Sequence, residues 1–170
     1  GKLRANSSSW YGKLLAHLGI AVFIVGVTMV NGYQVERDVR LDPGQSTEVS
    51  GWTFTFKGIE PAPGPNYQAF VGTVEVRRGG ALVEVLRPEK RVYAASRQSM
   101  TEAAIDTRLT GDLYVSLGEP VTPDGVAGAW GVRIYVKPFV DWIWGGCLLM
   151  ALGGFLAIAD RRYRIKVRER

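Results

Sequence analysis

Two long apolar segments lie near the ends of the chain. The first covers residues 14–30, 17 residues without a formal charge, and aromatic residues flank it at Trp10 and Tyr33. The second covers residues 139–159, and its only charge is Asp141. A helix of about 20 residues crosses a hydrocarbon core, and aromatic side chains collect at its two interfaces. The pattern therefore predicts an integral membrane protein with two transmembrane α-helices, at residues 10–33 and 139–159.

Between these segments the hydrophobic pattern changes to a period of two. Trp52, Phe54 and Phe56 alternate with polar residues, which is typical of a strand with one buried face. The pair Gly79-Gly80 separates two further apolar stretches and predicts a hairpin turn. The other strand candidates are residues 33–41, 91–95, 105–110, 113–117 and 129–136. Turn signals separate them at 42–44, 61–66, 118–120 and 123–125. About eight short strands predict one all-β domain at 34–138, a small sandwich or barrel.

The distribution of charge predicts the orientation of the two helices. The net charge is +5, with 21 Lys and Arg against 16 Asp and Glu. Basic residues outside the central domain are Lys2, Arg4, Lys13, Arg161, Arg162, Arg164, Lys166, Arg168 and Arg170. On the other side, near the helices, there are four: Arg37, Arg40, Arg133 and Lys137. Because basic residues are retained in the cytoplasm, both termini are expected there, with a cytoplasmic lead at 1–9 and a basic tail at 160–170 that meets anionic lipid.

Two other assignments are disfavoured by the same segments. A cleaved signal peptide has an apolar stretch of about 7 to 15 residues and a small-residue cleavage site, and residues 14–30 fit neither. Nucleic-acid binding is not expected, because no aromatic and basic interleaving accompanies the basic tail.

The inventory of reactive side chains excludes several kinds of site. One Cys and one His cannot form an internal disulfide or a structural zinc site. The predicted β-domain has neither residue, and it has no nucleophile motif. Its charges alternate along strands, as in Glu89-Lys90-Arg91, which favours a solvated sheet face over a partner-binding face. Replacing Glu89 or Arg91 tests the second interpretation.

His17 is an ionisable residue inside a predicted span, and such residues are functional candidates by default. Small residues at Gly12, Gly19 and Gly26 form a stripe that predicts close packing against another helix. Helical geometry places His17 on a different face. Three interpretations remain open: a hydrogen bond between helices, a proton relay, and ligation of a haem iron through neutral imidazole. In the third, the second axial ligand comes from outside this chain.

The second predicted helix has its own stripe of small residues. Gly146 and Gly153 belong to this stripe, which also includes Met150 and Ala157, so this helix is expected to have a helical partner. Cys147 lies beside it and is interpreted as a packing residue.

Ordered blocks along nearly the whole chain resemble the C-terminal quarter of the CcmF family of bacterial cytochrome c maturation proteins. The blocks are Trp10-Tyr11-Gly12, Ala16-His17-Leu18-Gly19, Gly26, Gly64-Pro65-Asn66-Tyr67, Pro88-Glu89-Lys90-Arg91-Val92-Tyr93, Thr101-Glu102-Ala103-Ala104-Ile105-Asp106, Asp112-Leu113-Tyr114-Val115-Ser116-Leu117-Gly118 and Asp160-Arg161-Arg162-Tyr163-Arg164.

The resemblance implies a component of a haem lyase in the bacterial inner membrane, with the β-domain in the periplasm. The family receives haem from the chaperone CcmE and attaches it to apocytochrome c, together with CcmH and sometimes CcmI. Family members hold a b-type haem between two transmembrane His residues, and His17 matches one of these axial ligands. Lys13, one turn away, is a candidate contact for a haem propionate. The other ligand and the haem-handling segments belong to the remainder of CcmF, so this chain lacks a complete site for thioether formation.

The alternative from another class is a membrane-anchored β-domain that acts as a structural and docking scaffold without a cofactor. In that case His17 is a packing residue. A haem absorption band that depends on His17 separates the two functions.

Overall fold

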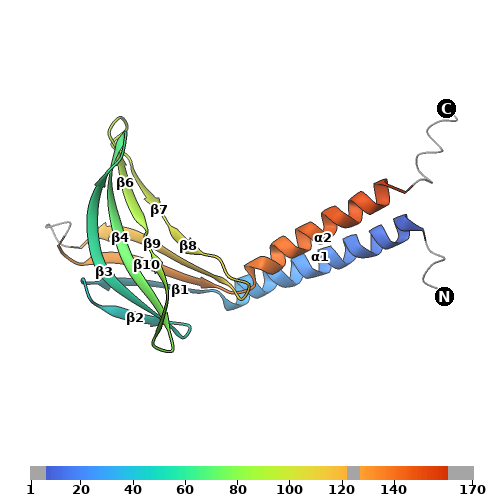
Figure 1. Cartoon of the computed structure of the whole chain (residues 1–170), viewed down its shortest axis with the longest axis horizontal. Helices are drawn as coiled ribbons and strands as arrows, with labels where there is room; N and C mark the ends of the chain where they lie inside the picture. Colours follow the sequence, from blue (N-terminus) through green and yellow to red (C-terminus); the bar gives the residue numbers. More distant parts are fainter. Residues whose placement is uncertain (1–6, 122–126, 161–170) are drawn as a thin grey trace. The chain divides into compact units, whose positions relative to one another are not determined.

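The computed structural model describes residues 7–121 and 127–160, and it separates into two compact units. One unit contains the two helices, which precede Gln34 and follow Pro138 in the sequence. The other unit is the β-domain, Gln34–Pro138. Figure 1 shows both units, with the helices in blue and red and the strands in the colours between them. Each unit is described separately below.

The helical unit consists of α1 (Ser8–Tyr33) and α2 (Val140–Ile158), which run antiparallel. Both helices are long and apolar enough to cross a membrane, and few of their residues are buried within the described chain. The first helix begins two residues before Trp10. The backbone N–H of Ser9 donates to the carboxylate of Asp160 at 2.9 Å, which satisfies one of the N–H groups that a helix start leaves without a partner.

Glycines form the contact between α1 and α2, as the two stripes of small residues predicted. A Cβ on Gly19 would lie 2.8 Å from the carbonyl oxygen of Gly146, and a Cβ on Gly153 would lie 2.6 Å from that of Gly12. Gly26 packs against the backbone of Ile143 in the same way. The absence of side chains therefore lets the two backbones touch, and each helix is the partner that the other requires.

The β-domain contains ten described strands in two antiparallel sheets. They are β1 (Val35–Leu41), β2 (Ser46–Val49), β3 (Trp52–Pro63), β4 (Tyr67–Arg78), β5 (Ala81–Leu86), β6 (Glu89–Tyr93), β7 (Ser99–Glu102), β8 (Ala104–Asp106), β9 (Asp112–Pro120) and β10 (Trp130–Lys137). One sheet has the order β1-β10-β9-β8. The other has the order β2-β3-β4-β6-β7, and β5 also pairs with β4.

The core of the β-domain lies between the two sheets, where alternate side chains of each strand meet. The three aromatic residues of β3 that were predicted to share a buried face do so: Trp52 is 7% exposed, and Phe54 and Phe56 are fully buried. The predicted hairpin is also confirmed, because Gly79 and Gly80 connect β4 to β5 with φ angles of 57° and 84°. Two positive φ angles are what a two-residue type I′ turn needs.

Proline misled the prediction of two strand ends. Strand β3 continues through Pro61 to Pro63, because β2 and the residues just before it pair only with residues 52–56, so no N–H is needed on that side at the two prolines. Strand β9 likewise continues to Pro120, opposite Trp130.

The predicted strand at 105–110 ends at Asp106 instead. A tight turn follows, in which the N–H of Gly111 donates to the carbonyl of Arg108 at 2.9 Å. Strands β2 and β7 were not predicted. The expected turn at 123–125 and most of the expected lead and tail lie outside the described residues.

Candidate functional site

His17 lies on the face of α1 that points away from α2. The residues that share this face are exposed; they are Lys13, Ala21, Ile24, Thr28 and Asn31. The glycines that contact α2 are the buried residues of the helix, together with Ser9. The glycine stripe and the imidazole therefore occupy separate surfaces, and the contact between the two helices leaves the imidazole accessible.

The hydrogen bonding of His17 identifies its tautomer. Nδ1 of the ring lies 2.7 Å from the backbone carbonyl oxygen of Lys13. A carbonyl oxygen only accepts, so Nδ1 carries the hydrogen and donates it. In the neutral ring, Nε2 is then left with its lone pair, which is the form in which an imidazole ligates a metal.

The surroundings of His17 fit the flat apolar ring of a haem. Leu14, Leu18 and Ile20 on neighbouring turns are 55%, 53% and 45% exposed, and Ala21 one turn away is small. The described residues contain no group of three or more His, Cys, Asp or Glu side chains that could hold a metal ion among themselves. His17 is the single imidazole of the chain. Lys13 shares the exposed face, where its ammonium group is open to solvent, lipid or another ligand.

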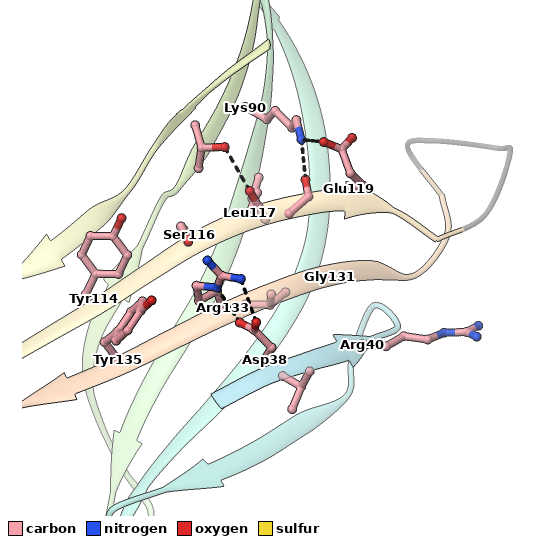
Figure 2. Close-up of a pocket in the computed structure, with 14 residues that line it drawn as sticks. Asp38, Arg40, Lys90, Tyr114, Ser116, Leu117, Glu119, Gly131, Arg133 and Tyr135 are labelled. Atoms are coloured by element: carbon pink, nitrogen blue, oxygen red, sulfur yellow. Dashed lines mark hydrogen bonds and ion pairs between the residues drawn. The ribbon is translucent and has the colours of Figure 1, made fainter. Parts of the chain in front are cut away.

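A second candidate site is a polar cleft of about 630 Å³ on the outer face of the sheet β1-β10-β9. Strand register brings its residues together in rows across the sheet. Asp38, Arg133 and Ser116 form one row, and Tyr135 and Tyr114 form the next. Figure 2 shows these side chains on one face, with Lys90 and Glu119 at the other end of the cleft from the two tyrosines.

Ion pairs occupy most of the charges at this cleft. Arg133 donates to both carboxylate oxygens of Asp38, at 2.7 and 2.8 Å. This pair of hydrogen bonds holds the pKa of Asp38 below its ordinary value. Tyr135 donates to Glu36 at 2.7 Å, and this hydrogen bond raises the pKa of the Tyr135 hydroxyl. Asp38 is therefore ionised near neutral pH, and both Asp38 and Glu36 already have hydrogen-bond partners.

Lys90 is the buried cation of the cleft. Its side chain is 8% exposed, and its ammonium donates to the carbonyl of Gly118 at 2.9 Å and to the carboxylate of Glu119. The Glu119 side chain is 79% exposed. The adjacent Arg91 lies outside the cleft, where it pairs with Glu89 at 2.8 Å and with Glu102 at 3.3 Å. These contacts favour the solvated sheet face as the interpretation of the Glu89 and Arg91 charges.

The sequence did not identify the cleft residues as a site, because their positions are far apart and have no common motif. Lys90 and Glu119 are 29 residues apart, and Asp38 and Arg133 are 95 apart. The alternating pattern of a strand shows which residues share a face. It does not show which strands pair, so the rows across the sheet were not predictable.

Comparisons with known proteins agree along most of the chain. A family model described as the CcmF C-terminal beta-sandwich matches residues 32–138. The cytochrome c-type biogenesis protein CcmF of Pseudomonas aeruginosa is 49% identical over 167 residues, which are 98% of this chain and 25% of that protein. CcmF of Escherichia coli is 48% identical over 159 residues, 94% of this chain and 24% of that protein.

A solved structure, that of a cytochrome c heme lyase CcmF, has the same fold. It superimposes with a TM-score of 0.72 at 20% sequence identity, covering 87% of this chain and 24% of that chain. The chain thus spans about a quarter of the length of the relatives it matches. Because the family model covers more than half of the chain, the chain belongs to the CcmF family.

Proposed function

We propose that this chain is the C-terminal part of a cytochrome c maturation haem lyase, in which it helps to hold a membrane-bound b-type haem. The names of its relatives support the pathway, since they are cytochrome c-type biogenesis proteins and a heme lyase. The haem is assigned to the exposed face of α1, with His17 as one axial ligand. The second ligand comes from the remainder of the CcmF protein, outside this chain.

One observation carries the proposal: the bond from Nδ1 of His17 to the Lys13 carbonyl leaves Nε2 free on an exposed face of α1. A hydrogen bond at the second ring nitrogen fixes the tautomer and raises the basicity of the ligating nitrogen. The same carbonyl fixes the ring plane relative to the helix. When bound, haem would supply the iron that the His17 imidazole ligates. This chain supplies the imidazole, its orientation and an apolar surface for the ring.

The β-domain is assigned a docking role in the same assembly. Its described residues include no His and no Cys, so it offers neither of these ligands to iron. The expected partners are the haem chaperone CcmE, CcmH with or without CcmI, and apocytochrome c. The two helices are assigned to the inner membrane, with the termini in the cytoplasm and the β-domain in the periplasm.

The absorption spectrum of the full assembly carrying His17→Ala tests the haem assignment. Removing the imidazole leaves one protein ligand on the iron, so we expect loss of most of the haem or a five-coordinate spectrum. Added imidazole is expected to restore the six-coordinate form, because the variant loses only the iron ligand and keeps its fold. Thr28→Ala is the matched control, since its hydroxyl lies on the same face and bonds only to the carbonyl of Ile24, at 2.8 Å.

An unchanged, stoichiometric six-coordinate haem in the His17→Ala assembly contradicts the proposal. In that case the scaffold function without a haem ligand in this chain is correct, and His17 is a packing residue. Lys13→Ala examines the weaker assignment separately: a propionate contact predicts a shifted haem spectrum, whereas a lysine that reaches the lipid headgroups predicts none.

A further inference from the structure

We propose that the cleft on the outer face of β1-β10-β9 docks an extended, carboxylate-bearing segment of a partner protein. This inference rests on the docking role proposed above and names the surface and the chemistry of the partner. It follows from three features of the cleft: an open glycine floor, unused hydrogen-bond donors, and the distance across the strands that carry those donors.

The floor of the cleft is made of backbone, because Gly131 of β10 and Gly118 of β9 lie next to each other there. The fold itself does not need glycine at position 131. A Cβ at that position would meet its nearest neighbour, the carbonyl oxygen of Glu119, at an ordinary contact distance of 3.6 Å, and the residue has no positive φ. The missing side chain leaves space on the sheet face that a ligand can occupy.

The unused polar groups of the cleft are donors. Three basic and two acidic side chains line it. Arg133 is paired with Asp38 and Lys90 with Glu119, so both acids are neutralised. Arg40 has no partner among the described residues. In Figure 2 its side chain extends outward from β1 at the rim of the cleft.

Ser116 adds a donor at the base of the cleft. The residue is 7% exposed, and its hydroxyl has no hydrogen-bond partner in the part of the chain that the structure describes. The ammonium group of Lys90 has three N–H donors and uses two on Gly118 and Glu119. A ligand that accepts hydrogen bonds and carries negative charge satisfies all three residues, whereas a cation satisfies neither Arg40 nor Lys90.

The spacing of these donors favours an extended peptide over a small anion. Arg40 lies on β1 and Ser116 on β9, with β10 between them. Two strand spacings are about 10 Å, which is about three residues of extended chain. A small anion cannot contact both donors. A peptide crossing the strands can place a carboxylate at Arg40 and present its main-chain carbonyls to Ser116 and Lys90.

Selection from a random peptide library tests the proposal on the 170-residue chain in lipid nanodiscs. Peptides that bind the unchanged chain and fail to bind the variant with Gly131→Leu are sequenced. The expected result is enrichment of Asp and Glu in that set, because the added side chain extends into the cleft while its Cβ meets the fold at ordinary contact distances. Circular dichroism confirms that the variant keeps its strands. A library that returns no such peptides, or peptides without an acidic excess, overturns the proposal.

Charge reversal provides the second measurement, using fluorescence anisotropy of the most enriched peptide. Arg40→Glu is expected to weaken binding at least about tenfold, as loss of a charge-assisted hydrogen bond does. Arg37→Glu is the matched control, because it makes the same charge change on β1 at a position that faces the other side of the sheet. Equal weakening by both variants shows a non-specific charge effect and overturns the docking site.

The result of the peptide-binding measurements is independent of the haem assignment. Peptide binding is measured on the β-domain surface, whereas the haem spectrum depends on His17. A chain that carries His17→Ala is expected to keep its peptide affinity. Failure of peptide selection with an intact haem spectrum therefore rejects the cleft alone, and the reverse pattern rejects the haem assignment alone.

Discussion

The two partners of one ion pair in the β-domain have very different surroundings. Lys90 is buried and donates to the Gly118 carbonyl as well as to Glu119, whereas Glu119 is almost fully exposed. A buried polar group without a partner destabilises the fold, because its lost hydrogen bonds to water are not replaced. The contribution of this pair to stability therefore depends on which side chain is removed.

Lys90→Met is expected to destabilise the β-domain by about 1 to 3 kcal/mol, because it leaves the half-buried Gly118 carbonyl without its donor. Glu119→Gln is expected to cost less than about 1 kcal/mol, since Gln keeps an acceptor at an exposed position and the bond from Lys90 to Gly118 survives. Urea unfolding of the full chain, followed by circular dichroism of the strands, measures both. Equal losses would show that the ion pair, rather than the bond to the carbonyl, stabilises the domain.

Residues differ in how far the sequence alone reveals their role. His17 was identifiable because a single imidazole in an apolar segment is unusual whatever the fold. Its bond to the Lys13 carbonyl is local, four residues back along the helix. Arg40 and Ser116 have ordinary surroundings in the sequence, and only the pairing of β1, β10 and β9 brings them to one cleft. A role that depends on long-range pairing leaves no local signal.

At the scale of whole elements, the contact between α1 and α2 rests on the absence of side chains. Neighbouring glycines on α2 have opposite surroundings. A Cβ on Gly146 would lie 2.6 Å from the backbone nitrogen of Phe23, whereas a Cβ on Gly145 would meet nothing within 4 Å. The two positions share the same helix and the same depth, so they form a matched pair for substitution.

Gly146→Leu is expected to separate the helices by more than about 1 Å, because ordinary contacts begin near 3.5 Å. Gly145→Leu is expected to leave the spacing unchanged. Electron–electron double resonance in nanodiscs measures the distance between nitroxide labels at Leu18 and Leu148, which are both exposed. The labels are attached after Cys147→Ser removes the native thiol. A distance that Gly146→Leu leaves unchanged would mean that the glycine stripe does not hold the pair together.

Elements were predictable wherever one periodicity dominated a segment. The long apolar segments identified both helices, and the alternation at 52–56 identified a strand with three buried aromatic side chains. Proline gave the wrong strand ends, because it disrupts a strand only where its missing N–H is needed, and β3 has no partner on that side at Pro61 and Pro63. The short strands β2 and β7 are mostly polar, and their pairing with β3 and β6 fixes them more than their own sequence does.

For the whole molecule, the proposed topology follows from charge that is concentrated outside the β-domain. Nine basic residues flank the helices on the side of the termini, against four on the side of the β-domain. Residues 34–138 carry 12 basic and 13 acidic side chains, so the charge of this segment does not oppose its export.

A protease recognition sequence inserted between Gly79 and Gly80 tests this topology, because a Cβ on either residue of that turn would meet nothing within 4 Å. We expect protease added outside spheroplasts to cut this site. The same sequence placed after Arg170 is the control, and it should be cut only after the membrane is made permeable. Protection of the turn together with cleavage after Arg170 would reverse the orientation, and the β-domain would then lie on the wrong side of the membrane to meet periplasmic partners.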